Sequence, residues 1–241
     1  MGLESFTGLY RNLIACSFTG VIALTAVGGS NYLRKRRLIS SELSRKIVHV
    51  SASCWLVVWP YFDSSHWSWR LNAAVPLAYS VVLFVKGLII KDRNDPDVRT
   101  MSRTGDPSEL LLGPLMFTMA MTLTGLALFG REEGAMMMAV LGFGDGFAPV
   151  IGKKYGKHRY KALGRVKTIE GSLACFVFSL IGMQVFRSFL GYPYYNFVKW
   201  VIVASVGTIV EAFSPSDFDN ILIPLAVYHT MPIARYISTL V

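Results

Sequence analysis

Charged residues are scarce in this sequence, at 16% of 241 residues, whereas soluble domains carry about 25%. Hydrophobic residues make up 53%, and the mean hydropathy is +0.45. A long polar stretch between the apolar segments is also missing. These shortages exclude a soluble globular enzyme and indicate one polytopic membrane domain over residues 1–241.

Cysteine is almost absent as well. The three cysteines, Cys16, Cys54 and Cys175, lie far apart in apolar segments and show no CxxC spacing. We therefore expect small core side chains rather than a disulfide or a cysteine-ligated metal. The N-terminus also lacks the pattern of a signal peptide or of a Ser- and Arg-rich transit peptide, which leaves the compartment open.

Apolar segments of membrane-spanning length are abundant. A helix needs about 20 apolar residues to cross a bilayer. Windows of this size predict an all-α bundle of about seven or eight transmembrane helices. The expected spans are residues 12–33, 47–62, 71–90, 109–129, 134–152, 171–190, 196–212 and 220–239. Because 47–62 and 196–212 are short, seven spans or a re-entrant segment stay open.

Positive charge is concentrated in alternate loops of this span pattern. The formal net charge is +9, and the loops at 34–46, 91–103 and 153–167 hold most of the lysines and arginines. By the positive-inside rule these loops face the cytosol or its equivalent, and both termini face the other side. Such a surface binds anionic headgroups or substrates. Nucleic acid is not an expected partner, because no platform of stacking aromatics accompanies the basic loops.

One aspartate, Asp145, lies within the apolar segment 134–152. A carboxylate at membrane depth is costly and usually belongs to a site. Pro149 cannot donate a hydrogen bond to the Asp145 carbonyl, and the glycines at 142, 144 and 146 weaken the same turn. The sequence therefore predicts a broken helix with a carbonyl beside a carboxylate, an arrangement that suits Mg²⁺.

The most basic stretch of the chain follows at residues 152–172. It differs from a P-loop, because the spacing of its glycines is one residue short and no Ser or Thr follows the lysine. Glycines nevertheless permit close backbone approach, and lysines supply charge to phosphates. We expect this loop to bind a polyphosphate; a basic loop that touches lipid headgroups is the alternative.

Further polar motifs fall on the same predicted side of the membrane. They are the segments 45–49 and 102–109, Glu170, Glu211, and the pair Asp219 and Asn220. Their convergence on one face favours a single active site. Asp106, Pro107 and Glu109 also fit a helix N-terminus, with a cap, a first-turn proline and a capping-box acid.

Five of these motifs resemble the phytol kinase and farnesol kinase family, within the wider group of polyprenol kinases. The resemblance covers residues 40–225 and follows the family's order and spacing. The motifs are Arg45-Lys46-Ile47-Val48-His49, Ser102-Arg103-Thr104-Gly105 with Glu109–Leu115, Gly144-Asp145-Gly146, Lys167-Thr168-Ile169-Glu170-Gly171-Ser172, and Asp219-Asn220 through Pro224.

The resemblance implies Mg²⁺-assisted transfer of the γ-phosphoryl group of CTP to the hydroxyl of an isoprenoid alcohol, most closely phytol, or farnesol or geranylgeraniol. It assigns catalytic roles to Asp145, Glu170 and His49 and metal binding to Asp145, Asp219 and Asn220. The nucleotide would meet Lys153, Lys157, Lys161, Lys167, Gly152, Gly156 and Arg103. The protein would be integral to a plastid membrane or the endoplasmic reticulum, or to a bacterial inner membrane. The oligomeric state is left open.

Two other classes of membrane protein share part of this pattern. Phosphatidate cytidylyltransferases share the Gly-Asp and Gly-Lys-Lys-Tyr-Gly-Lys-His run, but their later His-Gly-Gly and Asp-Arg-x-Asp block is missing here. A small ion-coupled transporter would use a broken helix around Asp145 and Pro149, and it would predict internal repeats between the two halves. The sequence shows no convincing repeat.

Overall fold

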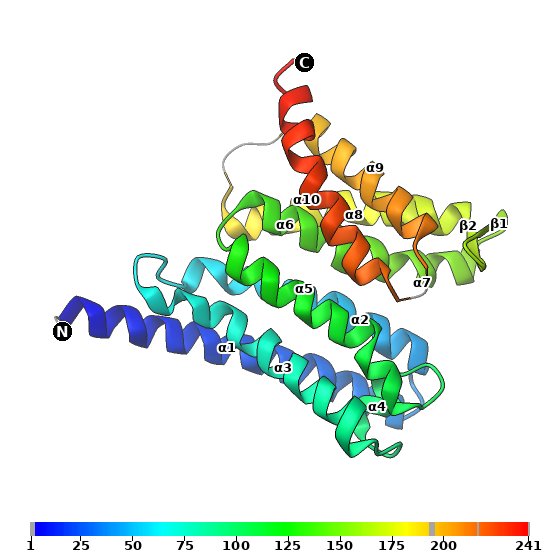
Figure 1. Cartoon of the computed structure of the whole chain (residues 1–241), viewed down its shortest axis with the longest axis horizontal. Coiled ribbons are helices and arrows are strands. Elements are labelled where there is room, and N and C mark those ends of the chain that lie inside the picture. The colour runs from blue at the N-terminus through cyan, green and yellow to red at the C-terminus, as the bar shows by residue number, and fades with distance from the viewer. Residues whose placement is uncertain (1–2, 193–195, 216, 241) are drawn as a thin grey trace. The chain divides into compact units, whose positions relative to one another are not determined.

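The computed structural model describes residues 3–192, 196–215 and 217–240, and the chain is almost entirely helical (Figure 1). The predicted all-α class is confirmed. Contacts divide the chain into two compact units, Met1–Gly130 and Arg131–Val241, and each is described by itself. The single domain expected from the sequence stays a prediction.

The first unit is built from α-helices joined by short helical turns. Its helices are α1 (Leu3–Lys35), α2 (Ser41–Ser53), α3 (Ala74–Val85), α4 (Pro96–Met101) and α5 (Gly113–Ala127). Tighter 3-10 segments occupy Cys54–Tyr61, Trp67–Ala73 and Pro107–Leu111, and a π-helical turn occupies Lys86–Ile90. One part of the core joins α2, α3 and α4 through Val48, Leu83, Val98, Met101 and Leu110.

Helix starts in this unit follow their capping residues. The Asp106 carboxylate accepts hydrogen bonds from the Ser108 backbone N–H at 2.8 Å and from its hydroxyl at 2.6 Å. These bonds hold the pKa of Asp106 below its usual range. Pro107 is the first residue of the helical turn, as its fixed φ favours. The predicted cap at Asp106 is therefore confirmed.

The second unit combines helices with one small hairpin. Its elements are α6 (Glu132–Met138), a π-helical segment (Ala139–Gly144), α7 (Asp145–Tyr155), β1 (Arg159–Ala162), β2 (Arg165–Thr168), α8 (Ile169–Leu190), α9 (Phe197–Phe213) and α10 (Asp219–Ile237). Met183, Phe186, Val203 and Ile223 are almost completely buried between the helices. Gly207 permits a close approach of α9, because a Cβ there would lie 2.2 Å from Val140 Cγ1.

Five helices of the described chain are long and apolar enough to cross a membrane. They cover Phe6–Lys35, Trp67–Ile90, Pro107–Ala127, Glu132–Tyr155 and Ile169–Leu190, and each matches a predicted span. The predicted span 47–62 is divided, because α2 ends at Ser53 and a 3-10 segment follows. Helix α9 has 17 residues, and α10 contains Pro224 and Pro232. The count of seven or eight spans is therefore not confirmed.

Candidate active site

Asp145 begins α7 directly after the π-helical segment. Its backbone N–H donates to the carbonyl of Val140, five residues earlier, and its side chain is buried. The helix continues through Pro149 to Tyr155, so the predicted break is wrong. The chain forms a wider π-helical turn at Gly142 and Gly144 instead of a break. Pro149 has no backbone N–H, so the Asp145 carbonyl still lacks its usual hydrogen-bond donor. Such π-turns occur frequently at functional sites.

The basic loop folds into an antiparallel hairpin, which the sequence analysis did not predict. Strands β1 and β2 pair Arg159 with Thr168 and Ala162 with Arg165. The turn between them places Leu163 at φ 44° and Gly164 at φ 79°. Positive φ at both central residues is what a tight hairpin turn requires. The strands have only four residues each, and charges interrupt their alternation, so the sequence signal was weak.

The register gives the hairpin two different faces. Successive side chains of a strand point to opposite sides. Tyr160 and Lys167 are paired, and with Arg165 they lie on the inner face, which contacts the helices. Arg159 and Lys161 lie on the outer face and are exposed. We use these two names, inner face and outer face, below.

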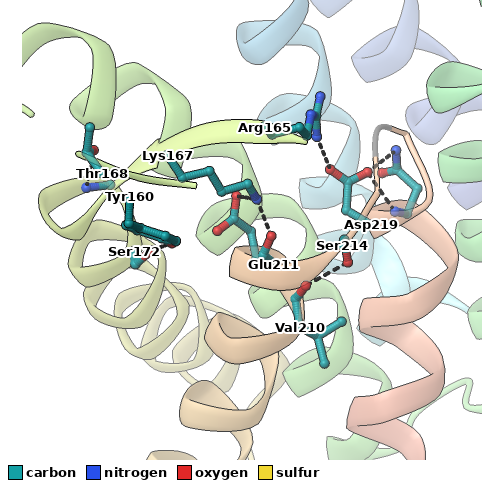
Figure 2. Close-up of polar contacts among 11 residues, drawn as sticks. Tyr160, Arg165, Lys167, Thr168, Ser172, Val210, Glu211, Ser214 and Asp219 are labelled. Carbon is teal, nitrogen blue, oxygen red and sulfur yellow. Dashed lines mark hydrogen bonds and ion pairs between the residues drawn. The ribbon is translucent and has the colours of Figure 1, made fainter. Parts of the chain in front are cut away.

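The inner face contacts three helices (Figure 2). The Tyr160 hydroxyl lies 2.6 Å from Ser172 Oγ on α8. Lys167 Nζ donates to Glu211 on α9, with 2.6 Å to Oε1, and also donates to the Glu211 backbone carbonyl. Arg165 lies 4.0 Å from Asp219 Oδ2 at the start of α10. The hairpin is thereby tied to the ends of α8, α9 and α10.

Glu211 belongs to the candidate site, although the sequence suggested no specific role for it. Its carboxylate is buried near the C-terminus of α9, where the helix dipole disfavours negative charge. The positive charge of Lys167 offsets both the burial of this carboxylate and the unfavourable helix dipole. Asp145 begins α7 next to Gly144, which packs against α8, since a Cβ at Gly144 would lie 3.2 Å from Cys175 Sγ. The signal in the sequence was an acid at the end of an apolar span.

Asp219 and Asn220 form the neighbouring part of the candidate site. Asp219 Oδ1 accepts from the Asn220 backbone N–H at 3.0 Å and from its amide nitrogen at 3.3 Å. Asn220 is 6% exposed, and its Oδ1 has no hydrogen-bond partner among the described residues. A buried oxygen without a donor, next to a carboxylate, fits a hard cation.

The described residues contain no group of three or more His, Cys, Asp and Glu side chains that could hold a metal. A cation beside Asp219 and Asn220 would therefore take further ligands from water or from phosphates. Mg²⁺ usually binds in this way, with one or two carboxylates and several non-protein oxygens. The donor set therefore fits Mg²⁺ bound together with a nucleotide.

Glu170 stabilises the base of the hairpin. Its Oε1 lies 2.7 Å from the His158 ring nitrogen, and both carboxylate oxygens lie 3.3 Å from the His158 backbone nitrogen. Next to it, Thr168 caps α8 by accepting from the Gly171 backbone N–H at 3.1 Å. His158 lies directly before β1, so this contact links the start of the hairpin to the start of α8. A catalytic role for Glu170 stays a prediction.

The remaining nucleotide-binding candidates of this unit lie around the hairpin. Lys153 and Lys157 are exposed, at the end of α7 and just beyond it. Gly152 and Gly156 have a packing role, because a Cβ at either would come within 2.8 Å of Thr168 Oγ1. Their glycine identity is therefore explained without a ligand. Lys161 lies on the outer face, away from Lys167.

Two candidates lie in the first unit. The His49 ring packs 4.0 Å from the ring of Phe117 on α5, measured between centroids. Arg103 is exposed, and its backbone N–H donates to the Glu109 carboxylate, which also accepts from the Thr104 hydroxyl at 2.8 Å. Glu109 thus organises the loop before its own helical turn. Convergence of these residues with Asp145 on one site stays a prediction.

Comparison with known proteins places the chain among lipid-modifying enzymes. A model of the cytidylyltransferase family matches residues 6–215. Probable phytol kinase 1, chloroplastic, of Glycine max is 34% identical over 216 residues, which cover 85% of this chain and 70% of that protein. Phytol kinase 1, chloroplastic, of Arabidopsis thaliana is 33% identical over 218 residues, which cover 86% and 69%. The chain belongs to the phytol kinase family of lipid alcohol kinases.

The resemblance to the phytol kinase family that the five motifs suggested is thereby confirmed. Membership supports CTP as the phosphoryl donor and an isoprenoid alcohol as the acceptor. Probable phytol kinase, chloroplastic, of Zea mays is 34% identical over 206 residues, 80% of this chain and 67% of that protein. No solved structure matches the chain.

Proposed function

We propose that the protein transfers the γ-phosphoryl group of CTP to the hydroxyl of phytol and yields phytyl monophosphate and CDP. The observation that carries this proposal is the Lys167–Glu211 pair beside Asp219 and Asn220, in the same unit as the buried Asp145. It lies where two candidate spans, Glu132–Tyr155 and Ile169–Leu190, end at a basic hairpin. A lipid alcohol can reach this level from the bilayer, and a nucleotide can reach it from water.

Phosphoryl transfer depends on positioning and charge neutralisation more than on covalent help from the protein. In our proposal Asp145 accepts a hydrogen bond from the alcohol hydroxyl and directs its oxygen toward the γ-phosphorus. Lys153 and Lys157, whose side chains are exposed, bind the triphosphate from the aqueous side of the site. Lys167 approaches it from the inner face, where the phosphate competes with Glu211 for the ammonium group.

Mg²⁺ is part of the proposal. When bound, it would neutralise negative charge on the phosphates. Asp219 and Asn220 would hold it through the Asp219 carboxylate and the orphan Oδ1 of Asn220, and Asp145 is the third ligand that the motifs suggest. Binding of Mn²⁺ to the purified protein, and its loss in Asp219→Asn, test this assignment without reference to turnover.

The other predicted residues take supporting places in the proposal. Glu170 fixes His158 and the base of the hairpin, and so positions Lys157 and Lys167. His49 and Arg103 belong to motifs of the first unit and are proposed to meet the alcohol and the nucleotide. Lys161 faces outward, so we give it no direct contact with the phosphates. The curated relatives are named chloroplastic, which supports a plastid membrane as the location.

The matching family is described by cytidylyl transfer, so that chemistry is the second candidate. CTP labelled on the α- or the γ-phosphorus separates the two reactions. Purified protein would receive either label with phytol, farnesol, geranylgeraniol or phosphatidate. We expect γ-label in the product and the highest kcat/KM with phytol. Label from the α-phosphorus in phosphatidate would establish cytidylyl transfer, and a higher kcat/KM with farnesol or geranylgeraniol would refute phytol as the preferred acceptor.

A further inference from the structure

The inner face of the hairpin holds two cations, and they are held differently (Figure 2). Lys167 lies 2.6 Å from Glu211, and the two side chains are 13% and 8% exposed. Arg165 lies 4.0 Å from Asp219, and these side chains are 29% and 13% exposed. Strong arginine–carboxylate pairs have N–O distances of about 2.7–2.9 Å and often two parallel hydrogen bonds. Arg165 is therefore a loosely held cation beside a tightly held one.

The guanidinium group of Arg165 has spare hydrogen-bonding capacity. It offers five N–H donors in a fixed plane. Within the part of the chain that the structure describes, Asp219 is its ion-pair partner, and the contact is too long for a hydrogen bond. The side chain is half-buried, so it reaches both the candidate site and solvent. It can bind a second anion while it keeps its place on β2.

The oxygen atoms near Arg165 suggest what that anion is. Asp219 Oδ1 is already used by the Asn220 amides, whereas Oδ2 is directed toward Arg165. A divalent cation that binds Oδ2 and the orphan Oδ1 of Asn220 would place two positive groups side by side. Repulsion between them is relieved if the guanidinium takes a phosphate oxygen of the nucleotide that accompanies the cation.

We propose that Arg165 is a further substrate-binding residue of this enzyme. Without nucleotide it neutralises Asp219; with a divalent cation on Asp219 it binds a phosphate group of the triphosphate. The guanidinium keeps its proton throughout and exchanges one oxygen partner for another. The proposal rests on the proposed function, in which Asp219 and Asn220 hold the cation.

The chain supplies a matched control for this residue. Arg159 is the same residue type on the same hairpin, but the register puts it on the outer face, and it is exposed. Arg165→Gln and Arg159→Gln would be compared with the wild-type protein in nanodiscs. Two affinities would be measured: Mn²⁺ alone, by electron paramagnetic resonance, and a non-hydrolysable CTP analogue with Mg²⁺, by equilibrium binding.

The two affinities should move in opposite directions in Arg165→Gln. Mn²⁺ alone should bind more tightly, because a competing cation has gone. The CTP analogue should bind about 10- to 100-fold more weakly, the effect of losing a charged hydrogen bond to phosphate. Arg159→Gln should change either affinity by less than about twofold, since an exposed charge contributes little. Arg165→Lys keeps the positive charge but loses the planar set of guanidinium N–H donors. Its affinity for the CTP analogue should fall between those of the wild-type protein and Arg165→Gln.

Two results would overturn the proposal. One is an Arg165→Gln protein that matches Arg159→Gln in both affinities while the wild-type protein phosphorylates phytol; the proposed function then stands without Arg165. The other is weaker Mn²⁺ binding in Arg165→Gln, since Arg165 would then support the cation rather than compete with it. A wild-type protein that binds neither Mn²⁺ nor the analogue would refute the proposed site and Arg165 together. If Arg165→Gln does not fold, Arg165→Lys with unchanged analogue affinity and unchanged Mn²⁺ affinity serves as the contradicting result.

Discussion

The two ends of the second unit use the same kinds of ion pair for different purposes. At the end without the hairpin, Glu132 and Glu133 begin α6, where the helix dipole favours acids. Lys199 on α9 lies 2.7 Å from Glu132, and Arg235 on α10 pairs with Glu133. The Trp200 indole also donates to Glu132 at 3.3 Å. Each acid there has a cation partner, and the pairs join the ends of three helices.

At the hairpin end the charges are not balanced in this way. Glu211 lies near the C-terminus of α9, where the helix dipole disfavours its charge. The ion pair between Arg165 and Asp219 is long, at 4.0 Å, and the buried Oδ1 of Asn220 has no hydrogen-bond partner among the described residues. Exposed cations such as Lys157 and Lys161 add positive charge at this end. The difference between the two ends shows that ion pairs alone do not identify a substrate-binding site. The end that we propose to bind substrate differs in three ways: an acid lies at the C-terminus of a helix, one ion pair is long, and positive charge is in excess.

The largest expected effect comes from Asp145→Asn. The substitution keeps size and hydrogen-bonding ability but removes the charge, and removing one well-placed electrostatic group costs about 10²–10³ in rate. We expect that loss in γ-label transfer to phytol, with helicity and the apparent Tm close to those of the wild-type protein. Glu133→Gln, at the balanced end, is the control and should retain turnover. A folded Asp145→Asn protein with wild-type turnover would contradict the site assignment.

A charge exchange tests whether the Lys167–Glu211 pair serves more than stability. Removing one partner of a buried pair costs about 3–5 kcal/mol, so Lys167→Met and Glu211→Gln should each lower the apparent Tm in detergent. The double variant Lys167→Glu/Glu211→Lys should recover most of that Tm. Its turnover should stay about 10²-fold low, because the ammonium group then lies on α9 rather than on β2, and small misplacements near the reacting groups cost that much.

The same charge exchange in the Glu132–Lys199 pair, at the end without the hairpin, is the control. Glu132→Lys/Lys199→Glu should retain wild-type turnover, since that pair is proposed to join helices and nothing more. Its Tm should recover only in part, because a lysine at the start of α6 opposes the helix dipole and cannot accept the hydrogen bond from Trp200. Equal recovery of turnover in both double variants would mean that Lys167 and Glu211 are a structural pair as well.

Sequence reasoning found most of this arrangement and missed parts of it for physical reasons. Hydropathy located all five membrane-length helices, because about 20 apolar residues in succession are a strong signal. It could not find the hairpin, whose strands have four residues each and whose docking depends on Glu211 and Asp219, far along the chain. The π-turn before Asp145 also escaped prediction, since local rules favour a break where tertiary packing preserved the helix.

The smallest expected effect distinguishes Lys157, which precedes the hairpin, from Lys161 on the outer face. Lys157→Ala should weaken use of CTP by about 10- to 150-fold, the range for a charged hydrogen bond of about 1.5–3 kcal/mol. Lys161→Ala should change the KM for CTP by less than about twofold, because the register directs Lys161 to the outer face, where water screens it. Initial rates at varied CTP and fixed phytol measure both. Added salt should raise the KM of the wild-type protein and of Lys161→Ala alike, and that of Lys157→Ala less, because one screened contact has already gone. If Lys161→Ala loses as much as Lys157→Ala, the outer face also binds nucleotide, and the exclusion of Lys161 from the binding site is wrong.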